Sequence, residues 1–161
     1  MPHDISYYLH CFNRLNRASV GNQKAPHKPI LLLTISTLIE EGLILENHIT
    51  LSDMLISRFK QIWKEMVDDG TARTIRLAEG LTVKSGSKYP FKCSIENPFY
   101  HLQNEPFWRL IPGEDFVDKS NYSIGALRKC FLYAEIDQEL FELLRENASR
   151  DLIVNELKRL L

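Results

Sequence analysis

The segment from Ala25 to Pro29 places a histidine and a lysine between two prolines, immediately before an apolar run that begins at Ile30. Imidazole and ammonium groups bind anions, and the first turn of a helix adds backbone N–H groups that have no partner within the helix. Pro29 suits the first position of a helix, where a missing N–H costs nothing. His27 and Lys28 therefore predict an anion site, such as a phosphate site, at a helix N-terminus.

A second segment, residues 97–110, is denser in aromatic, proline and histidine side chains than an ordinary surface loop. Together the two segments resemble the DNA sulfur-binding domain, which precedes the nuclease domain in type IV HNH endonucleases and reads phosphorothioate-modified DNA. The family patterns are a Pro-His-Lys/Arg-Pro loop before a Leu-rich helix, and Tyr-Pro-Phe-aromatic-x-Leu followed by a nearby Trp. The positions that match the second pattern are Pro98, Phe99, Tyr100, Leu102 and Trp108.

This resemblance implies a set of contact residues. In a phosphorothioate, sulfur replaces one non-bridging phosphate oxygen, and it is larger and less strongly hydrated than oxygen. A protein that recognises this linkage therefore needs cations for the DNA backbone and a small apolar cup for the sulfur. The family's sulfur contacts correspond here to Asn97, Pro98 and His101, with Asn97 in place of the usual Tyr. His27 and Lys28 would face the same site from the helix N-terminus.

The basic stretch between the two segments is expected to add DNA contacts. Arg73 has the planar fork that suits guanine O6 and N7. Phosphate contacts position a protein without reading sequence, and they are expected from Lys84, Ser85, Ser87 and Lys88. Tyr89-Pro90-Phe91 is an alternative register for the Tyr-Pro-Phe pattern, although only the later segment has Leu102 and Trp108 after it.

These side chains also have purely structural interpretations. His27 can hydrogen-bond to loop carbonyl groups, and His101 can pack between Phe99 and Trp108. Phe99, Phe107 and Trp108 are typical of a core. The resemblance favours a binding site, whereas no single residue does so.

The size and composition suit one globular domain, residues 1–161, because 44% of the 161 residues are hydrophobic. Cys11, Cys93 and Cys130 are widely spaced, so neither a disulfide framework nor a zinc site is expected, and a reducing cytoplasm fits. No secretory signal pattern opens the chain, and no apolar run approaches the roughly 18–20 residues of a membrane span. We expect a cytoplasmic protein that needs no cofactor and no membrane.

The charges are unevenly distributed along the sequence, although the net charge is −1. Residues 5–39 contain four cations and no acid, and residues 71–109 contain six cations and three acids, whereas acids gather near the C-terminus. This distribution predicts one positive and one acidic face, with random scatter over the surface as the alternative. A positive face suits a nucleic-acid partner.

Helical periodicity predicts most of the fold. We expect an amphipathic helix over residues 5–18 with Asp4 as N-cap, a buried central helix over 29–41 closed by Gly42, and a helix from a Ser52 cap to about residue 69. Residues 43–51 suit a short hairpin or an extended link, 71–94 a basic loop between short strands, and 107–111 a strand. A helix over 123–131 and two terminal helices, 137–147 and 149–161, complete a mainly α fold with a small β element, a helical bundle around a central apolar helix.

The usual nuclease and hydrolase motifs are absent from the sequence. Its five histidines form no His-Glu-x-x-His or His-Asn-His arrangement, so the family's metal-dependent HNH domain is not expected in this chain. The expected function is a non-catalytic module of type IV restriction that binds phosphorothioated double-stranded DNA, with a nuclease domain or subunit as a further partner. Two alternatives are a regulatory or protein-interaction domain associated with a restriction nuclease, and a divergent nuclease with a metal at Asp53, Glu65 and Asp68, acids that also suit the solvent face of a helix.

Overall fold

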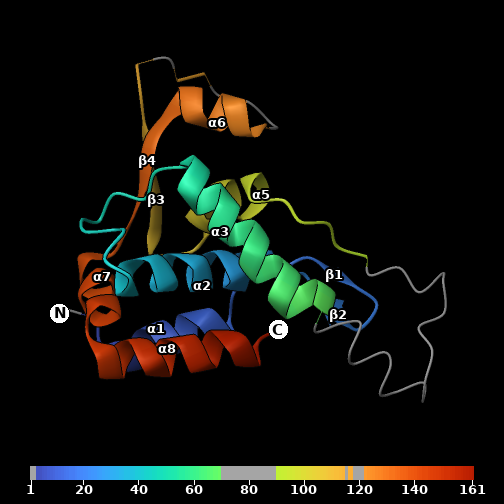
Figure 1. Ribbon diagram of the computed structural model, residues 1–161, viewed down its shortest axis with the longest axis vertical. Coiled ribbons are helices and arrows are strands. Elements are labelled where there is room, and N and C mark those ends of the chain that lie inside the picture. The colour runs from blue at the N-terminus through green and yellow to red at the C-terminus, as the bar shows by residue number, and fades with distance from the viewer. Residues whose placement is uncertain (1–2, 70–89, 115, 118–121) are drawn as a thin grey trace.

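Helix α2, His27–Glu40, lies at the centre of the structure, and other helices pack around it (Figure 1). The computed structural model describes residues 3–69, 90–114, 116–117 and 122–161. The described helices that pack most extensively on α2 are α3, Asp53–Trp63; α5, Glu96–His101; α7, Gln138–Arg145; and α8, Asn147–Arg159. This arrangement agrees with the predicted bundle around a central apolar helix.

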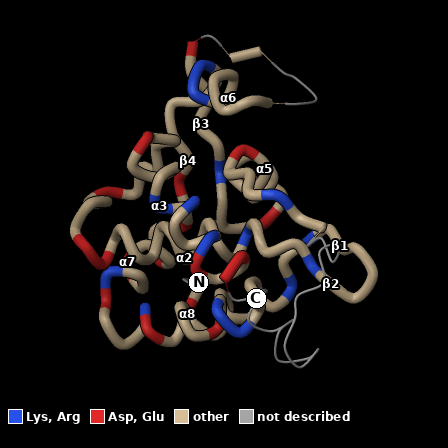
Figure 2. The backbone as a smooth tube through the Cα atoms, turned by 45° about the vertical axis from the view of Figure 1, so that its right-hand side comes forward, with Lys and Arg blue, Asp and Glu red and all other residues tan. Residues whose placement is uncertain are grey.

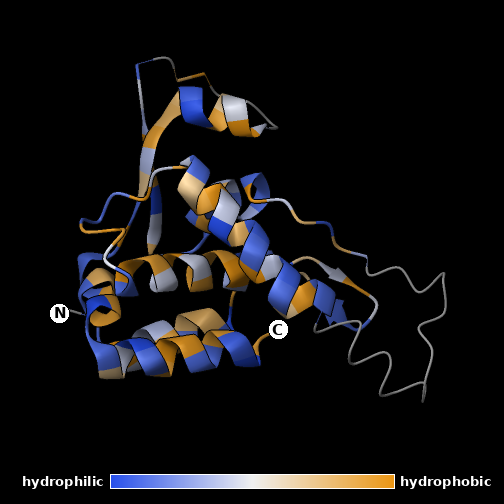
Figure 3. Cartoon of the chain, in the orientation of Figure 1, coloured by the Kyte–Doolittle hydropathy of each residue, from blue (hydrophilic) through white to orange (hydrophobic). Residues whose placement is uncertain are grey.

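α2 is buried because it is apolar on nearly every side. Its side chains at Ile30, Leu31 and Leu38 are fully covered, and Figure 3 shows hydrophobic residues along most of the helix. The buried hydroxyl groups of Thr34 and Ser36 donate to carbonyl oxygens one turn earlier, at 2.7 and 2.8 Å. These bonds satisfy both hydroxyls without a partner from another element.

Both ends of α2 lie close to their predicted places. The helix begins at His27 rather than Pro29, because the Pro26 carbonyl already accepts the N–H of Ile30 at 3.0 Å. Proline is still compatible with the third helical position, where an N–H would have no intrahelical partner. At the other end Gly42 adopts a φ of 76°, and the N–H groups of residues 42 and 43 donate to carbonyls of the last turn. The predicted C-terminal glycine is confirmed.

Helix α1, Ile5–Asn13, lies beside α8 (Figure 1). Asp4 caps it as predicted, since its carboxylate accepts the N–H of Tyr7 at 3.0 Å. The helix ends at residue 13 rather than 18, because the chain then turns at Gly21 into a hairpin of two short strands, β1, Ser19–Val20, and β2, Gln23–Lys24. Strands of two residues are too short to give an alternating pattern in the sequence.

Helix α3 starts at its predicted cap, where the Ser52 hydroxyl accepts the N–H of Leu55 at 3.1 Å. It continues into a π-helical turn, Lys64–Asp68, which agrees with the predicted end near residue 69. The residues before it, 43–51, form the extended link rather than the hairpin. Within this link, the backbone of Ile49 pairs with Ala134.

The larger of the two described sheets pairs β3, Trp108–Pro112, with β4, Phe131–Ile136, in antiparallel order. The strand predicted over 107–111 is therefore confirmed within one residue. Helix α6, Ile124–Cys130, begins at a Ser123 cap and ends one residue before the predicted end. Strand β4 is not predicted, because only its pairing with β3 and Ile49 identifies it as a strand.

Helices α7 and α8 confirm the two predicted terminal helices. The mainly α fold with a small β element is confirmed as well. Within the predicted basic loop and short strands over 71–94, residues 71–89 lie outside the described residues, and 91–94 form no helix or strand. In the part of the chain that the structure describes, no helix is both long and apolar enough to cross a membrane.

Candidate nucleic-acid interface

A pocket of about 430 Å³ opens where the start of α2 meets α5 and the chain that follows α1. It brings together every predicted contact residue that the structure describes. These are Asn97, Pro98 and His101 of the predicted sulfur cup, and His27 and Lys28 of the predicted anion site. The other lining residues are Asn16, Arg17, Ala18, Ala25, Phe91 and Asn104.

Asn97, Pro98 and His101 share the pocket because they lie on α5, a helix that the sequence pattern does not predict. Helix α5 is short and passes directly into a 3₁₀ turn, Leu102–Asn104. Residues three and four positions apart lie on one face of a helix, so His101 lies beside both Asn97 and Pro98. The spacing that the resemblance implies for the sulfur cup therefore corresponds to one helical face.

His101 lies outside the core. The rings of Phe99 and Trp108 pack edge to face with centroids 5.7 Å apart, whereas the exposed ring of His101 contacts Tyr100. The interpretation that His101 packs between Phe99 and Trp108 is therefore wrong. The interpretation of Phe99, Phe107 and Trp108 as core residues is confirmed, because all three are buried.

The imidazole of His27 already has a backbone partner. Its Nε2 lies 2.7 Å from the carbonyl oxygen of Lys92, and because a carbonyl only accepts, Nε2 carries a proton. The ring also packs against Trp63 and Phe91, with centroids 4.7 and 6.1 Å away. Burial lowers the pKa of His27, and the Lys92 carbonyl and Glu96 only partly oppose this effect. The predicted bond to a loop carbonyl is confirmed, and the same side chain lines the pocket as a neutral group at neutral pH.

Lys28 is paired with Glu105, a residue that no motif of the sequence marks. The Lys28 Nζ lies 3.6 Å from Glu105 Oε1, and each residue is only 8% exposed. Burial lowers the pKa of Lys28, while the neighbouring Glu105 acts in the opposite direction. Glu105 Oε1 also accepts the backbone N–H of Asn16 at 2.9 Å. One buried carboxylate thus holds two residues of the pocket wall.

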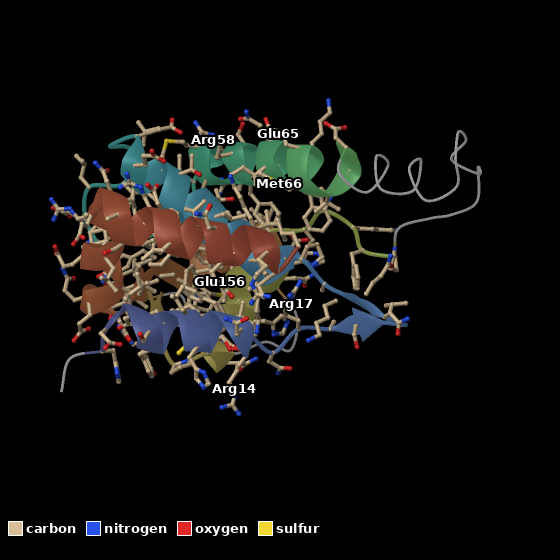
Figure 4. All side chains as sticks on the ribbon, turned by 90° about the horizontal axis from the view of Figure 1, so that it is seen from below. Arg14, Arg17, Arg58, Glu65, Met66 and Glu156 are labelled. Atoms are coloured by element: carbon tan, nitrogen blue, oxygen red, sulfur yellow. The ribbon has the colours of Figure 1, made fainter. Side chains whose placement is uncertain are left out.

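Arg17 is a second cationic residue of the pocket, and the sequence identified it only as part of an acid-free stretch. Its Nε donates to the carbonyl of Ala25 at 2.7 Å, and a terminal nitrogen donates to the carbonyl of Leu160 at 3.1 Å. Figure 4 shows Arg17 beside the C-terminal end of α8. These bonds fix the chain between α1 and α2 against α8 and place a guanidinium group at the pocket wall.

The predicted DNA contacts of the basic stretch lie outside the described residues. They are Arg73, Lys84, Ser85, Ser87 and Lys88. Tyr89 of the alternative Tyr-Pro-Phe register also lies outside them, while Phe91 lines the pocket. The later segment thus supplies the α5 wall, and the earlier one supplies an aromatic ring beside it.

Cations and acids are interleaved over much of the described surface. Arg109, from the basic part of the sequence, pairs with Glu135 and Asp137 at 3.2 and 2.9 Å. Figure 2 shows both signs of charge close together along α7 and α8. In contrast, the described residues that line the pocket include Arg17 and Lys28 but no acid. An acid-free lining is therefore a local property of the pocket, although the carboxylate of Glu105 lies directly behind Lys28.

The acids proposed for a divergent nuclease lie on the solvent side of α3 and its π-helical turn. Asp53, Glu65 and Asp68 are all exposed, and Asp53 pairs with Arg128 at 2.7 Å. Across the described ranges, no group of three His, Cys, Asp or Glu side chains is arranged to hold a metal ion. These positions suit a solvated helix face.

Comparison with models of known protein families finds no match to this chain, and comparison with curated proteins finds none either.

Proposed function

We propose that this chain is a non-catalytic module that binds double-stranded DNA carrying phosphorothioate linkages through the pocket between α2 and α5. One observation carries the proposal. Asn97, Pro98 and His101 lie on one face of α5, and they line the same pocket as His27 and Lys28 at the start of α2. These are the contact residues that the resemblance to the DNA sulfur-binding domain implies.

The α5 side of the pocket has an apolar part, Pro98, and a polar rim, Asn97 and His101. Pro98 is buried, while Asn97 and His101 beside it are exposed. A phosphate oxygen placed against an apolar wall loses hydrogen bonds to water, whereas sulfur is less hydrated and loses less. The amide of Asn97 and the imidazole of His101 are suited to bind the remaining non-bridging oxygen. Selectivity for sulfur would then come from Pro98, and it would depend on the rim groups, because they orient the linkage so that its sulfur faces the apolar wall.

Affinity would come from contacts to the DNA backbone. His27 and Lys28, the first two residues of α2, line the pocket, and no described side chain caps this end of the helix. The positive end of the helix dipole therefore favours an anion there. Arg17 and Lys28 add cationic groups, and the sequence predicts further DNA contacts at Arg73, Lys84, Ser85, Ser87 and Lys88, which lie outside the described residues. Contacts of this kind weaken with salt and carry no sequence information. In a type IV restriction system, such a cytoplasmic module selects the DNA, and a nuclease domain or subunit cuts it.

Fluorescence anisotropy with two matched duplexes tests this proposal. One duplex carries a single phosphorothioate of natural stereochemistry and the other is unmodified, and both are titrated at the same salt concentration. A preference of about tenfold or more for the modified duplex, roughly 1.4 kcal/mol, is the expected result. Equal binding to both duplexes would reduce the module to a general DNA binder.

A second candidate is a regulatory or protein-interaction domain associated with a restriction nuclease. Leu43, Leu45 and Met54 are 49%, 74% and 40% exposed around a groove at the end of α2 that lies away from the pocket. Clustered exposed apolar side chains are typical of protein contacts. Under this alternative, DNA binding stays at non-specific levels of about 10⁻⁴ to 10⁻⁶ M for both duplexes.

A further inference from the structure

We infer that Glu105 sets the selectivity of the pocket for sulfur over oxygen, as a positioning residue that acts through Lys28. The inference rests on the proposed function. Glu105 lies behind the pocket wall, where its Oε1 is 3.6 Å from Lys28 Nζ and accepts the N–H of Asn16 at 2.9 Å. It therefore controls the position of one cation and one backbone segment of the wall.

A carboxylate is a costly group to bury behind an anion site. Glu105 is only 8% exposed, so it has lost most of its hydration, and its negative charge opposes any phosphate bound in front of it. A buried ion pair adds little net stability compared with apolar residues of similar size. Stability alone therefore does not explain the pair, whereas control of the charge at the pocket does.

The charge balance favours sulfur for a chemical reason. An ammonium group donates strong hydrogen bonds to phosphate oxygen, while sulfur is a weak acceptor. As long as Glu105 engages Lys28, an unmodified phosphate gains little from this cation, and the apolar wall at Pro98 decides between the two linkages. Release of Lys28 would strengthen the binding of a phosphate oxygen more than that of a sulfur. The pocket would then bind DNA more tightly and would discriminate less between modified and unmodified linkages.

The first test compares Glu105→Gln with Glu139→Gln. The Gln side chain at 105 keeps an oxygen for the Asn16 N–H but removes the charge, and Glu139 is an exposed acid of α7 away from the pocket, so both variants change the net charge equally. We expect Glu105→Gln to bind the unmodified duplex about tenfold more tightly. We also expect it to steepen the slope of log K against log salt by about 0.9 and to lower the preference for phosphorothioate. Glu139→Gln should keep both the slope and the preference of the parent protein.

A charge-balanced double variant covers the case in which Glu105→Gln does not fold. Removal of one partner leaves a buried unpaired charge, whereas Lys28→Gln combined with Glu105→Gln leaves none. If Glu105 acts through Lys28, Glu105→Gln should have no further effect once Lys28 is replaced, so the double variant and Lys28→Gln should show the same affinity and salt dependence. If the double variant binds the unmodified duplex about tenfold more tightly than Lys28→Gln does, then Glu105 acts on the DNA independently of Lys28, and the inference is wrong.

Small anions separate this inference from the proposed function. NMR titration of the Asn97 and His101 side chains with inorganic phosphate and with thiophosphate requires no DNA. A gain in phosphate binding in Glu105→Gln, with a smaller gain for thiophosphate, supports the role of Glu105 even if the parent protein does not prefer modified duplexes. Unchanged binding of both anions in Glu105→Gln, or a gain in phosphate binding that is equally large when Lys28 is also replaced, would overturn it. A missing duplex preference together with the expected anion effect would overturn only the proposed function.

Discussion

The indole Nε1 of Trp108 donates a hydrogen bond to the carbonyl oxygen of Phe99, with 3.1 Å between the two atoms. The bond joins strand β3 to helix α5, whose outer face forms one wall of the pocket. Carbonyl groups in the last turn of a helix have no partner within it, and α5 is short enough that a donor from outside stabilises much of its length. The placement of Asn97, Pro98 and His101 therefore depends on a core contact behind them.

Replacement of this indole should destabilise the protein. We expect Trp108→Phe to lower the free energy of unfolding by about 2–4 kcal/mol, because it leaves a cavity and a buried carbonyl without its donor. Urea unfolding measures the change, and amide exchange of residues 96–101 should accelerate. Tyr133→Phe is the control, because it keeps the ring that stacks on His48 and should stay within about 0.5 kcal/mol of the parent. An unchanged urea midpoint in Trp108→Phe would show that α5 does not depend on this bond.

Two glycines should respond to alanine in opposite directions. Gly42 has a φ of 76°, which L-residues rarely adopt, so Gly42→Ala should cost about 1–2 kcal/mol of stability. Gly125 lies within α6 in an ordinary helical conformation, and an added Cβ meets only Ser123 Oγ at 4.0 Å. Gly125→Ala should therefore stabilise the protein by about 0.5–1 kcal/mol. Thermal unfolding of both variants and the parent protein measures the two changes in stability. Equal shifts of the unfolding temperature in the two variants would contradict the explanation from backbone conformation.

The parts of the fold that follow from local pattern are predictable from the sequence. The apolar run from Ile30, the caps at Asp4 and Ser52, and the glycine at 42 all act within a few residues of their own position. Elements set by distant partners are not predictable in this way. Strand β4 depends on pairing with β3, and α5 depends on Trp108 as well as on a proline, Pro98, that the sequence presents as a loop residue.

In the candidate site too, the residues that belong to local motifs are predictable from the sequence, whereas those defined by distant contacts are not. His27, Lys28 and the α5 residues could be selected because they belong to two short motifs, and the fold then brings the motifs into one pocket. Glu105 carries no such signal, since a single glutamate among aromatic residues gives no indication that it will be buried. Its role follows only from a contact that spans 77 positions, from Lys28 to residue 105.

The stability of the protein should depend on pH through His27. Burial lowers its pKa below the ordinary value of 6.5, so the unfolded chain takes up a proton that the folded protein resists. This contribution to stability is present above about pH 6.5 and is lost as the pH falls through the lowered pKa of the folded state. Urea unfolding near neutral pH and about two units below measures the loss. In His27→Gln, which keeps a donor for the Lys92 carbonyl, the difference between the two pH values should be smaller, and an unchanged difference would assign the effect to other groups.

The exposed face of α5 should affect DNA selectivity and not stability. His101 is exposed and its contacts are at the surface, so His101→Ala should change the free energy of unfolding by no more than about 0.5 kcal/mol. The same substitution removes a donor at the pocket rim, and we expect it to reduce the preference for the phosphorothioate duplex by about three- to tenfold, since a net hydrogen bond contributes about 0.5–1.5 kcal/mol. Gln103→Ala is the matched control, because Gln103 is an exposed residue of the adjoining 3₁₀ turn that does not line the pocket. Anisotropy with the two matched duplexes measures both variants, and an equal loss of preference in both would place the selecting contact away from the α5 wall.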